Sequence, residues 1–131
     1  KDEVKRENKE TEGNPEIKRE RKKIHREMTE SDTTQSVKKS TVILTNPTHF
    51  AVGLYFKKGE TPLPIVSVKG VNLMAQRIIK LAENSGVPIY QDPPLARKIF
   101  FRSEVNQYVP TDMLQPIATV LRWVYQQYGN K

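Results

Sequence analysis

The stretch STVILTNPTHFAVGLYF, residues 40–56, contains two apolar runs separated by a short polar interruption. Thr41 to Leu44 is β-branched and aliphatic, which predicts a strand buried on both faces. Phe50 to Phe56 predicts a second strand. Asn46 to His49 lies between them and has turn chemistry, because Asn bonds to nearby backbone groups and Pro fixes φ. We therefore expect two strands joined by a turn.

The rest of the chain alternates between strand and helix patterns. Gly86 is suited to end a helix, and Asp92 is suited to cap a helix that begins with Pro93. The predicted elements are a strand at 65–68, a helix from about 71 to Gly86, a strand at 87–90, a helix from Pro93 through Phe100, and a helix from Thr111 or Asp112 to Tyr128. The prediction is a small α/β domain over residues 40–131, with a central sheet of about four strands and about three flanking helices.

Residues 1–39 have a different composition. They carry 12 Lys and Arg against 10 Asp and Glu, and their aliphatic side chains are too few to offset the entropy of ordering the segment. We predict a charged, partly helical N-terminal arm with a break at Gly13 to Pro15. Two alternatives remain open from composition, a solvated linker and a segment that lies on anionic membrane headgroups.

Composition excludes several classes of site. The chain has no cysteine, and its two histidines lie far apart, so neither a disulfide framework nor a metal centre is expected. Phosphate-binding loops, dinucleotide fingerprints and the common hydrolase motifs are absent. No cofactor is predicted. No apolar run is long enough for a membrane span. The chain begins with Lys and not with Met, so we expect a piece of a longer protein.

The pair Asn46-Pro47 carries unusual chemistry. Asparagine usually deamidates when the next backbone nitrogen attacks its side chain, but proline has no N–H for that route. The remaining cyclisation has the Asn46 carboxamide nitrogen attack the Asn46 carbonyl and expel the Pro47 nitrogen, which cuts the chain. The residues also allow an inert turn, since Asn-Pro is an ordinary turn pair.

Two neighbours have candidate supporting roles. The His49 imidazole has the chemistry to move the proton between the carboxamide and the Pro47 nitrogen. Thr48 is predicted to donate a hydrogen bond to the developing oxyanion from its side chain or its backbone N–H. The candidate catalytic residues are therefore Asn46, Pro47, Thr48 and His49, with the cleavage site between Asn46 and Pro47.

The segment TNPTHFAV at 45–52 resembles the self-cleaving N-P-T-H site of the type III secretion export-switch family of flagellar FlhB and injectisome YscU. The charged segment at 3–28 resembles the linker that follows the last membrane helix in that family. GETPLP at 59–64, PLAR at 94–97 and Leu121-Arg122-Trp123 follow in the family's order. The resemblance covers nearly the whole chain and leans towards the injectisome members.

The resemblance implies a bacterial inner-membrane protein whose membrane domain precedes residues 1–39, with this piece on the cytoplasmic side. It implies a single-turnover autoprotease whose cut switches the export substrates of the secretion apparatus. The implied partners are other export-apparatus proteins, a length-control protein, and secreted substrates or their chaperones. No nucleic-acid partner is expected.

Two rival functions remain open on the sequence alone. A nucleic-acid-binding module is suggested by the calculated isoelectric point of about 9.7 and by basic clusters such as Arg19 to Arg26. Acidic residues interleave these clusters, which weakens that interpretation. The second rival is a non-cleaving interaction domain that docks an acidic partner through Arg97 or through Lys57 and Lys58.

Overall fold

The structure is a computed structural model that describes residues 30–47 and 49–129 of the chain. The helical stretches expected within residues 1–29 lie outside this part. The elements in chain order are α2 Glu30–Lys39, β1 Val42–Asn46, β2 Phe50–Tyr55, β3 Ile65–Val71, α3 Asn72–Ser85, β4 Ile89–Gln91, α4 Pro93–Arg102, the short 3-10 helix η2 Thr111–Met113, and α5 Leu114–Tyr128. The predicted α/β class is confirmed.

The four strands form one mixed sheet in the order β3-β2-β1-β4. β1 pairs antiparallel with β2 and parallel with β4, while β2 pairs antiparallel with β3. β1 is therefore an internal strand with partners on both sides. Its residues Val42 to Thr45 are all buried, which confirms the prediction of a strand covered on both faces.

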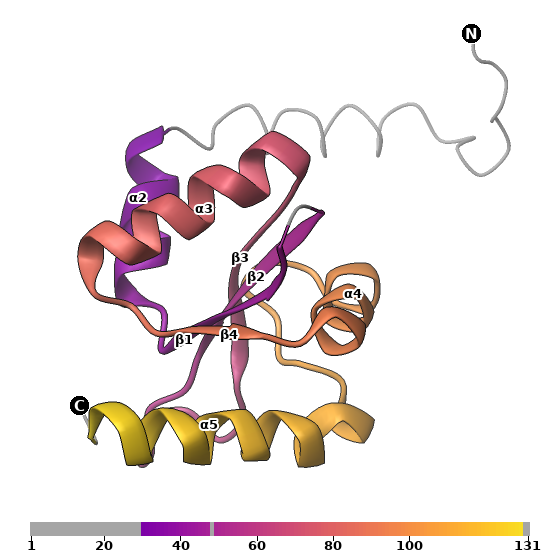
Figure 1. The fold of residues 1–131 in the computed structure, drawn as a ribbon. Coiled ribbons are helices and arrows are strands. Elements are labelled where there is room, and N and C mark those ends of the chain that lie inside the picture. The colour runs from indigo at the N-terminus through magenta and orange to yellow at the C-terminus, as the bar shows by residue number, and fades with distance from the viewer. Residues whose placement is uncertain (1–29, 48, 130–131) are drawn as a thin grey trace, which may run out of the picture. The chain divides into compact units, whose positions relative to one another are not determined.

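Helices cover both faces of the sheet (Figure 1). Because successive strand residues point to opposite faces, β1 contributes Ile43 to one core and Val42 and Leu44 to the other. The first core contains residues of α2 and α3, and the second contains residues of α4 and α5. The result is a sheet between two helical layers.

Helix boundaries follow the local signals at most positions. Gly86 directly follows α3 and adopts φ 73°, so it ends this helix as predicted. The Asp92 side chain caps α4, also as predicted, by accepting a hydrogen bond from the Leu95 N–H. The α3 start differs slightly from the prediction, since β3 continues through Val71 and Asn72 is the first helical residue. The pairing of Val71 with Phe50 of β2 explains this extension.

Part of the segment predicted as an arm packs against the domain. Residues from Thr33 onwards belong to the compact unit Thr33–Lys131. Val37 is fully buried in the same core as Ile43 and Ile78. Among the described residues, no helix has the length and apolar character needed to cross a membrane.

An exposed ion pair joins the end of α4 to η2. Arg102 donates two hydrogen bonds to the carboxylate of Asp112, at 2.9 and 3.1 Å. These hydrogen bonds hold the pKa of Asp112 below its usual value. Lys69 of β3 also binds α4, because its ammonium donates to the carbonyls of Phe100 and Ser103 at 2.9 and 2.7 Å. The Lys69 contact places a cation at the negative end of the α4 dipole.

Candidate functional site

The chain reverses direction between β1 and β2 at Asn46. The final pair of the ladder joins Asn46 to Phe50. The Asn46 carbonyl accepts a hydrogen bond from the backbone N–H of His49 at 2.8 Å, which is the bond that closes a β-turn. Pro47 therefore occupies the second position of this turn, where its fixed φ is favourable.

The Asn46 side chain lies at the margin of the sheet. Asn46 is half-buried, whereas Pro47 and His49 are exposed. Within the described residues, no hydrogen bond holds the Asn46 carboxamide. Asn46 forms the terminal pair of the ladder, so its side chain lies where the regular strand pairing ends.

Backbone contacts from two neighbouring junctions anchor the turn. At the start of α3, the N–H of Asn72 donates to the His49 carbonyl at 3.0 Å. At the start of α4, the N–H of Asp92 donates to the Thr45 carbonyl, also at 3.0 Å. Asn72 adopts φ 51°, a left-handed conformation that Asn tolerates better than most residues. The segments on both sides of the Asn46-Pro47 bond are thus held in place.

Aromatic rings pack beside the turn at the start of β2. The ring of Phe50 lies 5.1 Å from that of Phe100 and 5.5 Å from that of Phe101, both on α4. The His49 imidazole lies 6.5 Å from the Phe50 ring in an edge-on arrangement. Aromatic pairs at these separations are stabilising, so α4 fixes the residue that follows the turn.

The structure brings Asn46, Pro47 and His49 together in one turn, and Thr48 lies outside the described residues. In the structure the backbone N–H of His49 donates to the Asn46 carbonyl, and the donation predicted from Thr48 stays a prediction. The anchoring role of Asn72 was not predicted. It depends on the register of β2 with β3, for which the local sequence carries no signal.

Comparison with known proteins places the chain in a family. A family model described as the FlhB HrpN YscU SpaS Family matches residues 1–124. The chain belongs to this family. The resemblance of the chain to the export-switch family is therefore confirmed.

Relatives in the FlhB HrpN YscU SpaS family include injectisome and flagellar proteins. The chain is 46% identical over 131 residues to the Yop proteins translocation protein U of Yersinia pestis, and this match covers all of the chain and 37% of that protein. It is 39% identical over 126 residues to the flagellar biosynthetic protein FlhB of Yersinia enterocolitica, covering 96% of the chain and 33% of that protein. The chain thus spans about a third of each of these relatives, and the higher identity to the Yop protein supports an injectisome member.

Solved structures of the family share the fold. A mutated EscU C-terminal domain superposes with a TM-score of 0.70 at 42% identity, covering 72% of this chain and 94% of that domain. The cytoplasmic domain of FlhB from Shewanella putrefaciens superposes with a TM-score of 0.70 at 29% identity, covering 76% of this chain and 82% of that domain. The chain therefore matches the C-terminal, cytoplasmic part of its relatives.

Proposed function

We propose that this chain is the self-cleaving domain of a type III secretion export-apparatus protein, and that it cuts itself between Asn46 and Pro47. The observation that supports this most directly is the β-turn in which the Asn46 carbonyl accepts the His49 N–H at 2.8 Å. A hydrogen-bond donor on that carbonyl polarises it. The hydrogen bond becomes stronger as negative charge develops on the carbonyl oxygen during the attack. The bond expected to break is the one that follows this carbonyl.

The reaction is an intramolecular acyl transfer. The Nδ2 atom of Asn46 attacks the Asn46 carbonyl carbon, and the new carbon–nitrogen bond closes a five-membered imide. The bond to the Pro47 nitrogen breaks, and the proton lost from Nδ2 ends on that nitrogen. The products are a succinimide at residue 46 and a free secondary amine at Pro47. Water then opens the succinimide in a separate step.

Geometry supplies much of the acceleration for so weak a nucleophile. Well-oriented intramolecular attack lowers a barrier by roughly 7–11 kcal/mol. The hydrogen bonds from Asn72 and Asp92 hold the residues on either side of the turn, which keeps the carbonyl in place while the carboxamide rotates. The cut is a single-turnover event because the reacting groups belong to the same residue.

The two pieces are expected to stay together after the cut. β1 pairs with β2 and with β4, and its residues Val42, Ile43 and Leu44 are fully buried. Cleavage removes one covalent bond in an exposed turn and leaves these contacts intact. The cut would change the local surface near Pro47, which we propose switches the export substrates of the apparatus.

The placement of the whole protein follows from this proposal. The part of the protein before residue 1 would anchor it in the bacterial inner membrane, with this domain on the cytoplasmic side. Its partners would be other export-apparatus proteins, a length-control protein, and secreted substrates or their chaperones.

Mass spectrometry of freshly purified protein tests the cut. We expect two masses, one for residues 1–46 and one for residues 47–131, with an early population of the first piece lighter by one water because it still carries the succinimide. Denaturing electrophoresis should show two bands, while gel filtration under native conditions should show one species. A persistently intact mass would contradict the proposal. A piece 1–46 that never carries the succinimide would indicate a contaminating protease.

The His49 side chain gives a second prediction. His49→Ala keeps the backbone N–H on the Asn46 carbonyl but removes the proposed proton carrier, so cleavage should slow by about 100-fold. The fold should keep its thermal midpoint because the side chain is exposed. The half-time of cleavage is measured from denatured time points over a range of pH. Lys80→Ala, an exposed change on α3, is the control with an unchanged half-time. Equal half-times for the two variants would remove the imidazole from the mechanism.

A further inference from the structure

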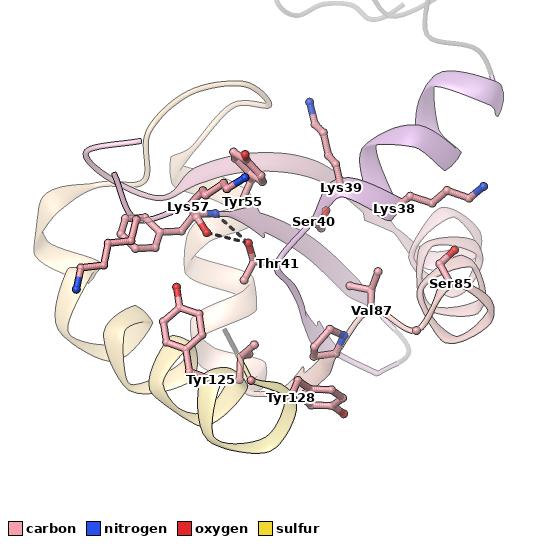
Figure 2. Close-up of a pocket in the computed structure, with 16 residues that line it drawn as sticks. Lys38, Lys39, Ser40, Thr41, Tyr55, Lys57, Ser85, Val87, Tyr125 and Tyr128 are labelled. Atoms are coloured by element: carbon pink, nitrogen blue, oxygen red, sulfur yellow. Dashed lines mark hydrogen bonds between the residues drawn. The ribbon is translucent and has the colours of Figure 1, made fainter. Parts of the chain in front are cut away.

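A cavity of about 540 Å³ lies at the end of the sheet away from the Asn46 turn. Its walls come from the end of α2, the start of β1, the end of β2, the loop between α3 and β4, and the end of α5 (Figure 2). We call it the cationic pocket, defined by the side chains that characterise it: Lys38, Lys39, Lys57, Lys58, Tyr55, Tyr125 and Tyr128. A cavity of this volume is within the range that holds small ligands or a few peptide side chains.

The charge of the cationic pocket is positive and largely unpaired. Its lining contains no Asp or Glu. Lys57 pairs with the neighbouring Glu60 at 3.8 Å. In the described part of the chain, Lys38, Lys39 and Lys58 have no carboxylate at ion-pair distance. Unpaired cations around a concave surface create a positive potential that attracts anionic groups.

The tyrosines of the cationic pocket favour a ligand that has apolar groups as well as negative charge. Tyr125 is half-buried, and Tyr128 is 45% exposed. Figure 2 shows both side chains on α5, below Thr41. Tyrosine combines a flat apolar surface with a polar hydroxyl and is enriched at protein interfaces. The pocket therefore offers stacking surfaces next to the lysines.

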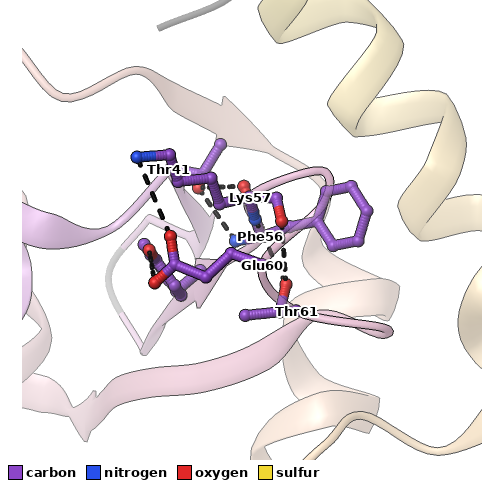
Figure 3. Close-up of polar contacts among 6 residues, drawn as sticks. Thr41, Phe56, Lys57, Glu60 and Thr61 are labelled. Atoms are coloured by element: carbon purple, nitrogen blue, oxygen red, sulfur yellow. Dashed lines mark hydrogen bonds and ion pairs between the residues drawn. The ribbon is translucent and has the colours of Figure 1, made fainter.

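Hydrogen bonds hold the floor of the pocket in shape. The Thr41 hydroxyl accepts from the Phe56 N–H at 3.0 Å and donates to the Phe56 carbonyl at 3.2 Å. The Thr61 hydroxyl accepts from the Lys57 N–H at 3.2 Å, and the Glu60 N–H donates to the Lys57 carbonyl at 2.9 Å (Figure 3). The start of β1, the end of β2 and the turn that begins at Lys57 are thus fixed before any ligand binds. This lowers the entropy cost of binding.

We propose that the cationic pocket binds an acidic peptide segment of a partner protein, in which carboxylates flank an aromatic or aliphatic side chain. The carboxylates would meet the lysines, and the apolar side chain would meet the tyrosines. A hollow with aromatic walls suits a peptide better than a flat membrane surface. Lysine ammonium groups are point charges without the fork geometry of arginine, so they can pair with single carboxylates along a peptide and need no bidentate acceptor.

The pocket is built from both sides of the proposed cut. Lys38 to Thr41 precede Asn46, while the residues from Tyr55 onwards follow Pro47. A bound peptide would contact both pieces and hold them together after cleavage. This second property rests on the proposed function, whereas binding itself does not.

The binding test uses the full 131-residue chain as the uncleavable variant Asn46→Ala. The probe is a fluorescein-labelled dodecapeptide of Glu and Asp with one central Phe and one Leu, followed by fluorescence anisotropy. Lys39→Glu and Lys58→Glu, one on each side of the cut, should each weaken binding by about tenfold. Lys80→Glu makes the same charge change on the exposed face of α3 and should alter binding by less than about twofold. Tyr128→Ala should weaken binding while leaving the salt dependence unchanged.

Several results would overturn the proposal. Equal weakening by Lys80→Glu would mean that the peptide responds only to net charge. Binding of anionic phospholipid vesicles or of single-stranded DNA with the same dependence on Lys39 and Lys58, without binding of the peptide, would assign the pocket to a different ligand. In the cleaved protein, saturating peptide should raise the urea concentration at which the two pieces separate. No such rise, with peptide binding intact, would refute the bridging of the two pieces.

Discussion

Asn46→Ala is expected to leave the chain as one polypeptide, with no detectable cut over the time in which the unsubstituted chain is cleaved completely. Alanine has no side-chain group that can attack its own carbonyl carbon, so the variant loses the nucleophile and not merely part of its activation. Its turn should persist, because the carbonyl of residue 46 and the His49 N–H are unchanged. The measurement is denaturing electrophoresis and intact mass on fresh and aged samples.

Two further variants make this prediction specific. Asn84→Ala removes an exposed asparagine of α3 and should leave cleavage unchanged. Pro47→Ala keeps the Asn46 nucleophile but restores a backbone N–H after it, which reopens the ordinary deamidation route. That variant should accumulate uncut, deamidated chains alongside any cut ones. Two bands in the Asn46→Ala sample would contradict asparagine cyclisation outright.

The second large effect concerns the central strand. Ile43→Ala deletes a fully buried side chain of β1 and should reduce the free energy of unfolding by about 2–5 kcal/mol. In the cleaved protein, the packing energy that this substitution removes is part of the contact between the piece 1–46 and the piece 47–131. We therefore expect the pieces to separate on gel filtration at low concentration, whereas the unsubstituted cleaved protein stays associated.

The matched control is Ile43→Val, which keeps a β-branched aliphatic side chain in β1. Ile43→Val removes one methylene and should cost only about 0.5–1.5 kcal/mol, leaving the pieces associated. Ile43→Ala combined with Asn46→Ala should remain a single folded chain, with only a lowered urea midpoint. Co-elution of the pieces in cleaved Ile43→Ala at every dilution would show that β1 contributes less to retention than its burial indicates.

Local chemistry was sufficient to predict much of the fold. The uninterrupted apolar run before Asn46 identified a doubly covered strand, and Gly86 and Asp92 marked helix ends because their conformational and capping preferences act within a few residues. The position of β4 beside β1 was not predictable in this way. It depends on how α3 crosses the sheet, and nothing near Ile89 specifies which strand it will pair with.

The same division applies to the site. Asn46, Pro47 and His49 were identified from their chemistry because they are neighbours in sequence. The hydrogen bond from the His49 N–H to the Asn46 carbonyl was not predicted, because it depends on how the turn closes. The contact from Asn72 required the register of β2 with β3. The burial of Val37 was also missed, because a single valine in a highly charged helix gives a weak periodic signal.

The central position of β1 has a consequence for cleaved molecules. Before the cut, this strand is covalently joined to β2 through the turn. After the cut, the upstream piece carries β1 and can leave the domain. Loss of this piece would leave β2 and β4 each with an unpaired edge where β1 had been. Cleaved molecules can therefore exchange the upstream piece with one another, whereas an uncut molecule can exchange this strand only as part of its whole chain, as in domain swapping.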